Sequence, residues 1–216
     1  MKVRQGFWFA AVLLIIILAG FARTGSCGSK DSGIKLPKTG QTTCYDSSGN
    51  VISCTNTGQD GELQKGVAWP NPRFVANSDT TITDNLTGLV WAANGNLMQT
   101  RDPHWKQVQT FVGAVIWQHA LDYVAKLNAE KYLGHNDWRL PNFKEIESLV
   151  NNAQTNTAEW LNSQGFSNVR ASDFYWSSTS YTNDAAKAWA VDMVWGNMKF
   201  LDKTRYFYVW PVRGGQ

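Results

Sequence analysis

The chain has 216 residues, with 20 lysines and arginines and 17 aspartates and glutamates, for a formal net charge of +3 at pH 7. Three of the basic residues precede Cys27 and no acidic residue does, so the remainder carries 17 bases against 17 acids. This balance excludes a general nucleic-acid-binding surface, and no nucleic-acid partner is expected. The length suffices for one well-buried domain with appended segments.

Residues 1–26 have the features of an export signal, either lipoprotein-type or ordinary secretory. Lys2 and Arg4 give a positive start, and residues 7–22 form an almost unbroken apolar run. A membrane-spanning helix needs about 20 residues, so this short run favours a cleavable leader over an uncleaved anchor. The protein is therefore expected in the cell envelope as an outer-membrane lipoprotein, or secreted to the cell surface.

Two processing sites are compatible with this leader. Gly20-Phe21-Ala22 suits ordinary signal peptidase, whereas Gly25-Ser26-Cys27 resembles a lipoprotein site in which Thr24 stands where a leucine is usual. Three cysteines in an exported chain leave one unpaired, and a lipid thioether at Cys27 would account for it. Such lipidation would tether the protein to a membrane.

Residues 27–66 are expected to form a polar linker that contains a small disulfide hairpin. Cys44 and Cys54 flank Ser48-Gly49-Asn50, a turn sequence that would bring the two cysteines opposite each other. In an oxidising compartment they should pair, which stabilises the segment by about 2–3 kcal/mol in the chain-entropy description. A metal site fits less well, because no histidine lies at a ligand-like spacing from either cysteine.

The main domain is expected over residues 67–216 and begins with short elements. Residues 80–83 are β-prone, Asp84-Asn85 opens a turn, and residues 89–91 form a short buried strand. Residues 94–104 have the polar, glycine- and proline-containing composition of a loop.

Two helices are predicted in the middle of the chain. The first spans residues 117–128, where apolar residues recur at every third or fourth position. The second starts after Pro141, because Asn142 occupies the N-cap position and Glu145 can complete a capping box. Apolar residues up to Val150 then recur at helical spacing, which gives this helix a buried face.

The last part of the chain is β in character. Residues 151–173 form a long, weakly periodic segment, and long loops inside compact domains tend to be functional. A tight turn at Trp195-Gly196-Asn197 separates the second and third of four strand candidates, which are residues 174–179, 188–194, 198–201 and 206–212. Two helices with an early strand and a late antiparallel sheet predict an α+β fold.

Four ordered blocks of sequence resemble one protein family. They are Asp84-Asn85-Leu86-Thr87-Gly88-Leu89-Val90-Trp91, residues 133–150, Tyr175-Trp176-Ser177-Ser178-Thr179-Ser180 and Tyr208-Val209-Trp210-Pro211-Val212-Arg213-Gly214-Gly215. Over residues 67–215 the chain resembles the C-terminal domain family of the legionella collagen-like protein. The resemblance implies a C-type-lectin-like fold with two helices packed on an antiparallel sheet, a bacterial surface location and, as in the best-known member, binding of sulfated glycans. The chain lacks that member's collagen-like stalk, so an oligomer is possible but its state stays open.

Catalysis is not expected. The lectin-like oxidases that make formylglycine use cysteines near the end of the domain, whereas all three cysteines here precede the domain. His104, His119 and His135 are scattered, and no nucleophile-elbow serine accompanies them. Asp173 and Asp192 could serve a glycosidase only if their carboxylates lay about 5–9 Å apart, which a sequence does not show.

No metal or cofactor is predicted. Calcium would need roughly six to eight converging oxygens. Asn136-Asp137 and Asn183-Asp184 are the most oxygen-rich pairs, but the Glu-Pro-Asn and Gln-Pro-Asp triplets typical of calcium-dependent lectins are absent.

Tryptophan is abundant, with 11 in the chain. Six of these residues occupy periodic or block positions and are expected in the core: Trp91, Trp117, Trp138, Trp176, Trp189 and Trp210. Trp195 differs because it lies in a turn beside Gly196 and Asn197, where an indole can remain exposed.

Trp195 and Asn197, with Lys199, Lys203 and Arg205 after them, form the candidate ligand site. Aromatic rings stack on sugar rings, amides bond sugar hydroxyls, and lysine and arginine bind sulfate. This pattern predicts non-catalytic binding of a carbohydrate, a sulfated glycan or a glycosaminoglycan, at the cell surface. The alternatives are a solvated face, or an envelope protein–protein assembly module whose aromatic surface is an interface.

Overall fold

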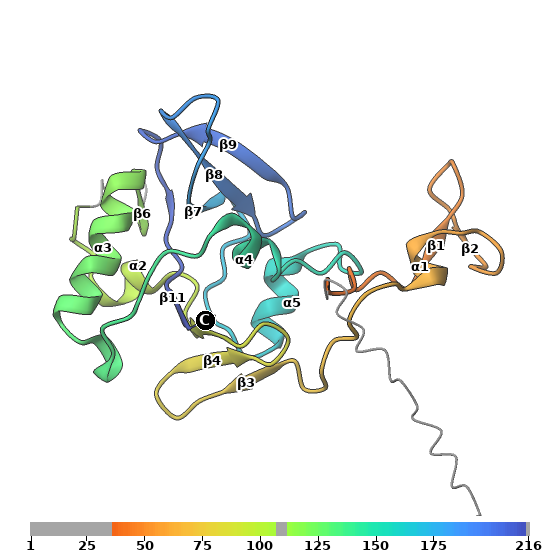
Figure 1. Ribbon diagram of the computed structural model, residues 1–216, viewed down its shortest axis with the longest axis horizontal. Coiled ribbons are helices and arrows are strands. Elements are labelled where there is room, and N and C mark those ends of the chain that lie inside the picture. The colour runs from red at the N-terminus through yellow and green to blue at the C-terminus, as the bar shows by residue number, and fades with distance from the viewer. Residues whose placement is uncertain (1–35, 107–111, 215–216) are drawn as a thin grey trace, which may run out of the picture. The chain divides into compact units, whose positions relative to one another are not determined.

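The computed structural model describes residues 36–106 and 112–214, so the expected leader and Cys27 lie outside the described residues. The described part of the chain has five α-helices and three β-sheets, which confirms the predicted α+β class (Figure 1). The helices are α1 (Asp60–Leu63), α2 (Leu97–Arg101), α3 (Trp117–Ala129), α4 (Phe143–Glu147) and α5 (Thr157–Ser163), with a 3-10 helix η1 (Tyr132–Gly134).

The largest sheet has five strands in the order β6-β10-β7-β8-β9. These strands are β6 (Ala114–Val115), β10 (Phe207–Tyr208), β7 (Phe174–Ser180), β8 (Lys187–Asp192) and β9 (Met198–Asp202). The pair β10–β7 is parallel and the other pairs are antiparallel, so the sheet is mixed rather than purely antiparallel.

Two further sheets are antiparallel. The four-stranded sheet has the order β11-β5-β4-β3, with strands β11 (Val212–Gly214), β5 (Leu89–Ala92), β4 (Thr81–Asp84) and β3 (Phe74–Ala76). A hairpin of β1 (Cys44–Tyr45) and β2 (Val51–Ile52) forms the third sheet. In the view of Figure 1, α4 and α5 lie between the hairpin β8–β9 and the strands β3 and β4.

Residues 206–212, expected as one strand, form two strands in different sheets. β10 ends at Tyr208 and β11 begins at Val212. Pro211 lies between them and has no N–H to donate to a ladder. Trp210 is fully buried, and its Nε1–H donates to the carbonyl oxygen of Ala92 at 2.8 Å. The chain therefore passes from one sheet to the other through this short segment.

Both predicted helices are present. α3 has the expected limits, and its buried residues are Ala120, Tyr123, Val124 and Leu127. At α4 the capping box is confirmed: Oδ1 of Asn142 accepts from the N–H of Glu145 at 3.0 Å, and Oε2 of Glu145 accepts from the N–H of Asn142 at 2.7 Å. α4 ends at Glu147, earlier than expected, although Leu149 beyond it is fully buried.

Two stretches expected as loops contain helices. α2 lies within residues 94–104, and α5 lies within residues 151–173, where Oδ1 of Asn156 caps it by accepting from the N–H of Glu159 at 3.2 Å. These helices span five and seven residues. Such lengths are too short for a periodic pattern to stand out in a sequence.

The tryptophan prediction holds for four of the six residues. Trp91, Trp138, Trp176 and Trp210 are buried in the main core. Trp117 and Trp189 are half-buried, although Nε1–H of Trp117 donates to the carbonyl oxygen of Ser177 at 2.8 Å. Trp189 stacks on Phe143 of α4 with 5.4 Å between ring centroids, so it packs on a helix at the surface rather than inside the core.

The N-terminal hairpin contains the expected disulfide. Cys44 is bonded to Cys54. The strand register places Cys44 opposite Ile52 rather than opposite Cys54, so the bond joins β1 to the residues that follow β2. α1 packs against this hairpin, where a Cβ atom on Gly61 would lie 2.6 Å from the carbonyl oxygen of Thr43.

Candidate ligand-binding pocket

The turn between β8 and β9 is fixed by backbone contacts. The N–H of Asp192 donates to the carbonyl oxygen of Asn197 at 2.9 Å, and the N–H of Gly196 donates to the carbonyl oxygen of Asp192 at 3.0 Å. Gly196 has φ +71°, and a Cβ atom there would lie 2.5 Å from Cγ1 of Val150, so the position requires glycine. Trp195 lies in this fixed turn and is 73% exposed.

A pocket of about 540 Å³ lies beside the turn. Residues 171–174, which lead into β7, contribute to its lining together with the β8–β9 hairpin. Its polar and aromatic lining residues are Ser172, Asp173, Phe174, Asp192, Trp195, Asn197, Lys199 and Tyr208. This volume falls in the range that small-molecule sites occupy.

The pocket brings together three of the five residues of the candidate ligand site. Trp195, Asn197 and Lys199 all line it. The hairpin turn explains this, because Asn197 closes the turn opposite Asp192 and Lys199 is the second residue of β9.

Lys199 presents an ammonium group to this pocket. It lies opposite Ala190, which lies opposite Trp176, so Lys199 and Trp176 share one face of the sheet. Its Nζ lies 5.6 Å from the ring centroid of Phe174. Among residues 36–106 and 112–214 no ion pair to Lys199 is present, so its charge is available to a ligand.

Two carboxylates face the same space. Asp192 is 7% exposed, and its Oδ1 accepts a hydrogen bond from the N–H of Val194 at 2.7 Å. Asp173 is exposed with φ +102°, a backbone conformation that non-glycine residues rarely adopt, and its Oδ1 accepts from the N–H of Phe174 at 3.0 Å. The two acids considered above as a possible glycosidase pair thus line one pocket.

Lys203 and Arg205 do not line this pocket. β9 rises by about 3.3 Å per residue, so the four residues from Lys199 to Lys203 span roughly 13 Å. Nζ of Lys203 donates to Oγ of Ser180 at 2.7 Å and lies 4.0 Å from the ring centroid of Trp117. The guanidinium of Arg205 lies 5.0 Å from the ring centroid of Phe207. Lys203 is therefore engaged at the other end of the hairpin. The ring beside Arg205, that of Phe207, packs on the lining residue Phe174 with 5.5 Å between ring centroids.

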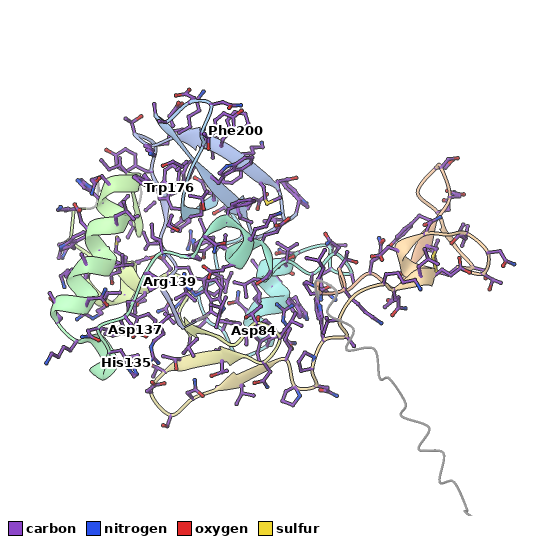
Figure 2. The ribbon with its side chains drawn as sticks, in the orientation of Figure 1. Asp84, His135, Asp137, Arg139, Trp176 and Phe200 are labelled. Atoms are coloured by element: carbon purple, nitrogen blue, oxygen red, sulfur yellow. A yellow bond between two sulfur atoms is a disulfide. The ribbon has the colours of Figure 1, made fainter. Side chains whose placement is uncertain are left out.

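The other residues weighed as site candidates contact cations or acids elsewhere. Nε of Arg213 donates to Asp137 at 3.0 Å, Nζ of Lys187 lies 3.0 Å from Asp184, and Nε2 of His135 lies 3.7 Å from Asp79. Figure 2 labels Asp137 and His135, which lie near each other and away from the β8–β9 hairpin. In the described part of the chain no three or more His, Cys, Asp or Glu side chains gather as metal ligands.

Sequence reasoning missed Asp192 as a neighbour of Trp195, and it missed Tyr208 and residues 171–172 as pocket lining. The pairing of Asp192 with Asn197 follows from the tight turn, because residues that flank a hairpin turn face each other. The lining contributed by Tyr208 and residues 171–172 could not be predicted in this way, because it depends on the pairing of β7 with β8 and of β10 with β7.

The sequence model of one protein family, the Lcl C-terminal domain, matches residues 80–213, more than half of the chain and the whole of the pocket lining. The chain belongs to the Lcl C-terminal domain family. This confirms the resemblance carried by the four sequence blocks, and the Lcl family indicates a bacterial envelope or surface protein. No curated protein matches the chain. None of the helices within the described ranges is both long and apolar enough to span a bilayer.

The four sequence blocks meet one another in the Lcl domain. Their mutual contacts are the bridge between Arg139 and Val212, the pairings of Val212 with Trp91 and of Tyr208 with Tyr175, and the hydrogen bond from the N–H of Ser178 to the carbonyl oxygen of Pro141. In Figure 2, Arg139 lies centrally among the side chains of the domain. Most of the pocket lining, by contrast, comes from segments between the blocks, so the blocks build the scaffold on which the pocket is carried.

Proposed function

We propose that this Lcl domain is a non-catalytic carbohydrate-binding module of the bacterial cell surface, with a C-type-lectin-like fold, and that the pocket beside Trp195 is its binding site. The observation that carries the proposal is the 73% exposure of Trp195 at a pocket that also holds an amide, an ammonium and two carboxylates. An exposed indole can cover the C–H face of a sugar ring, while the polar groups bond its hydroxyls.

The strand pairing supports the lectin-like fold. β11, the last described strand, pairs with β5 from the first part of the domain, so one sheet joins distant segments of the chain. α3 and α4 both contact β7 of the other sheet, as expected for helices packed on a sheet.

Binding without turnover is favoured by how the polar groups are held. The N–H of Val194 fixes the carboxylate of Asp192, and the backbone contacts of the turn fix Trp195 beside it. Fixed acceptors and an aromatic platform suffice for recognition.

Turnover is tested by incubating the protein with bound oligosaccharides and following their length by chromatography. Shortening that Asp192→Asn abolishes would overturn the non-catalytic assignment.

The binding test is a glycan array probed with the full mature protein and with Trp195→Ala. Loss of the stacking surface should weaken binding at least about tenfold. Phe200→Ala is the matched control, because Phe200 is also an exposed aromatic residue of the hairpin but does not line the pocket. No bound glycan, or equal binding by Trp195→Ala, would refute the proposal.

A protein–protein assembly role is the second candidate, and it rests on a different surface. Phe200, labelled in Figure 2, is 43% exposed. It stacks on Tyr181 with 4.2 Å between ring centroids and lies beside Trp189. If this aromatic surface binds an envelope protein, Phe200→Ala should abolish co-purification of that protein and Trp195→Ala should not. Co-purification that Phe200→Ala leaves unchanged would contradict this second candidate.

Attachment to a membrane through a lipid on Cys27 is also proposed, on the sequence of the leader. Mass spectrometry of the mature N-terminus tests it directly. A mass increase of the N-terminal peptide that corresponds to lipid is expected, and is lost in Cys27→Ser. An unmodified N-terminus after Ala22 would indicate ordinary signal peptidase instead.

A further inference from the structure

We infer that the pocket beside Trp195 selects an uncharged, hydroxyl-bearing sugar unit and disfavours a sulfated one, with Asp192 as the acceptor for the sugar hydroxyls. The inference rests on the proposed glycan binding and names the ligand class for that site. It differs from the sulfated ligand that the sequence suggests, because the structure surrounds Trp195 with different charges from those expected.

The first step is the chemistry of Asp192. One carboxylate oxygen accepts from the N–H of Val194 at 2.7 Å, and the other has no hydrogen-bond partner within the described residues. An ionised carboxylate can only accept hydrogen bonds, and hydroxyl groups that donate to it form short, charge-assisted bonds. A sulfate group can only accept as well. It would therefore leave this oxygen without a donor, whereas a sugar hydroxyl would donate to it.

The second step is the charge balance of the pocket. Asp173 and Asp192 contribute two negative charges, and Lys199 contributes one positive charge. The nearby cation Arg170 is not a lining residue; its guanidinium lies 5.2 Å from the ring centroid of Tyr208. Carboxylates therefore outnumber cations among the lining residues, and a ligand that brings a further negative charge meets like charges at short range, which disfavours its binding.

The third step concerns the cations that suggested sulfate. Nζ of Lys203 lies over the ring of Trp117 and the guanidinium of Arg205 lies over the ring of Phe207, and neither residue lines the pocket. Lys199 alone among the three basic residues of the candidate ligand site reaches the sugar position. A single ammonium beside two carboxylates suits a hydroxyl or a ring oxygen rather than a sulfate.

The experiment uses matched saccharides that differ in sulfation, such as dextran and dextran sulfate, together with array pairs of the same oligosaccharide with and without sulfate. For the pair that binds in a Trp195-dependent manner, the unsulfated member should bind at least about tenfold more tightly. Its affinity should also change little with ionic strength, because no net charge is neutralised.

Asp192→Asn is the decisive variant, since the amide oxygen can still accept from Val194 while the charge is removed. Asp192→Asn should weaken binding of the unsulfated sugar about tenfold, and it should reduce the ratio of the affinities for the unsulfated and sulfated sugars. Asp202→Asn is the control, because Asp202 is an exposed acid of β9 outside the pocket. Asp202→Asn should change neither the affinity for the unsulfated sugar nor the ratio of the two affinities.

The outcomes separate the two proposals. If the sulfated member binds equally or better through Trp195 and Asp192→Asn has no effect, the ligand class assigned here is wrong while the glycan site stands. If neither member binds, or if Trp195→Ala binds as the unaltered protein does, the proposed function falls and this inference falls with it.

Discussion

The guanidinium of Arg73 donates to both carboxylate oxygens of Asp84, each at 3.1 Å, and the two side chains are 4% and 0% exposed. The same guanidinium donates to the carbonyl oxygen of Ser148 at 2.6 Å and lies 4.4 Å from the ring centroid of Trp69. Arg73 precedes β3, Asp84 ends β4 and Ser148 follows α4, so one buried ion pair joins three segments.

Replacing Arg73 by leucine should leave Asp84 buried without a counter-charge. Breaking such a pair costs about 3–5 kcal/mol, because the remaining charge is desolvated and unpaired. Urea unfolding followed by tryptophan fluorescence would measure the loss in free energy of unfolding. Lys65→Leu, at an exposed position of similar chemistry, should change it by less than about 0.5 kcal/mol. A loss below about 1 kcal/mol in Arg73→Leu would show that water reaches Asp84.

The acid side of the stability profile should depend on Asp102. Burial raises the pKa of Asp102, but hydrogen bonds from Lys126 and Arg101 outweigh it and hold this pKa below its usual value of 3.8. A carboxyl group with a lowered folded-state pKa stabilises the fold above its unfolded-state pKa, about 3.9, and this contribution disappears as the pH falls through the folded-state pKa.

Asp102→Asn should therefore lower the free energy of unfolding by about 1 kcal/mol at neutral pH, and the difference from the unaltered protein should shrink as the pH falls below about 4. Chemical unfolding at a series of pH values would show this. A difference that stays constant with pH would indicate that the variant acts through packing, for example through the lost hydrogen bond from Tyr123 to Asp102, rather than through charge.

Trp210 and Trp195 should contribute very differently to the free energy of unfolding. Trp210 is fully buried between Trp91 and Phe166, with ring centroids at 5.6 and 5.3 Å, so Trp210→Ala should cost about 3–5 kcal/mol. Trp195→Ala should stay within about 0.5 kcal/mol of the unaltered protein, since the side chain is mostly in water. A large loss in Trp195→Ala would mean that its effect on ligand binding reports folding instead.

Removing the disulfide should act on the N-terminal hairpin alone. Cys44→Ser with Cys54→Ser should destabilise that segment by about 2–3 kcal/mol, because the unfolded hairpin gains freedom. Backbone amide exchange should rise at Tyr45, whose N–H donates to Gln59 across this segment. Exchange in α3 should stay unchanged, and faster exchange there would show that the hairpin supports the Lcl domain as a whole.

The local features of the fold were predictable because each is set by residues close in sequence. The capping box of Asn142 and Glu145, the apolar face of α3 and the turn at Gly196 all follow from spacing within a few positions. The division into two sheets was not predictable in this way. It depends on β10 and β11 leaving a single β-prone run for different partners, and no local pattern specifies a distant partner.

In the candidate site, too, only the residues close together in sequence could be grouped in advance. Trp195, Asn197 and Lys199 could be grouped because one hairpin holds them. Lys203 and Arg205 are near them in sequence but do not line the pocket, because their charged groups lie over the rings of Trp117 and Phe207. Asp173 reaches the pocket from the segment before β7, through a backbone conformation that the sequence does not reveal.

The segment of Val209, Trp210 and Pro211 ties the five-stranded sheet to the four-stranded sheet, and all three residues are buried. Neither sheet can melt while the other persists without exposing this hydrophobic crossing to water, so the domain should lose its structure in one cooperative step. Any ligand held at the hairpin would then raise the melting temperature of strands that it never touches.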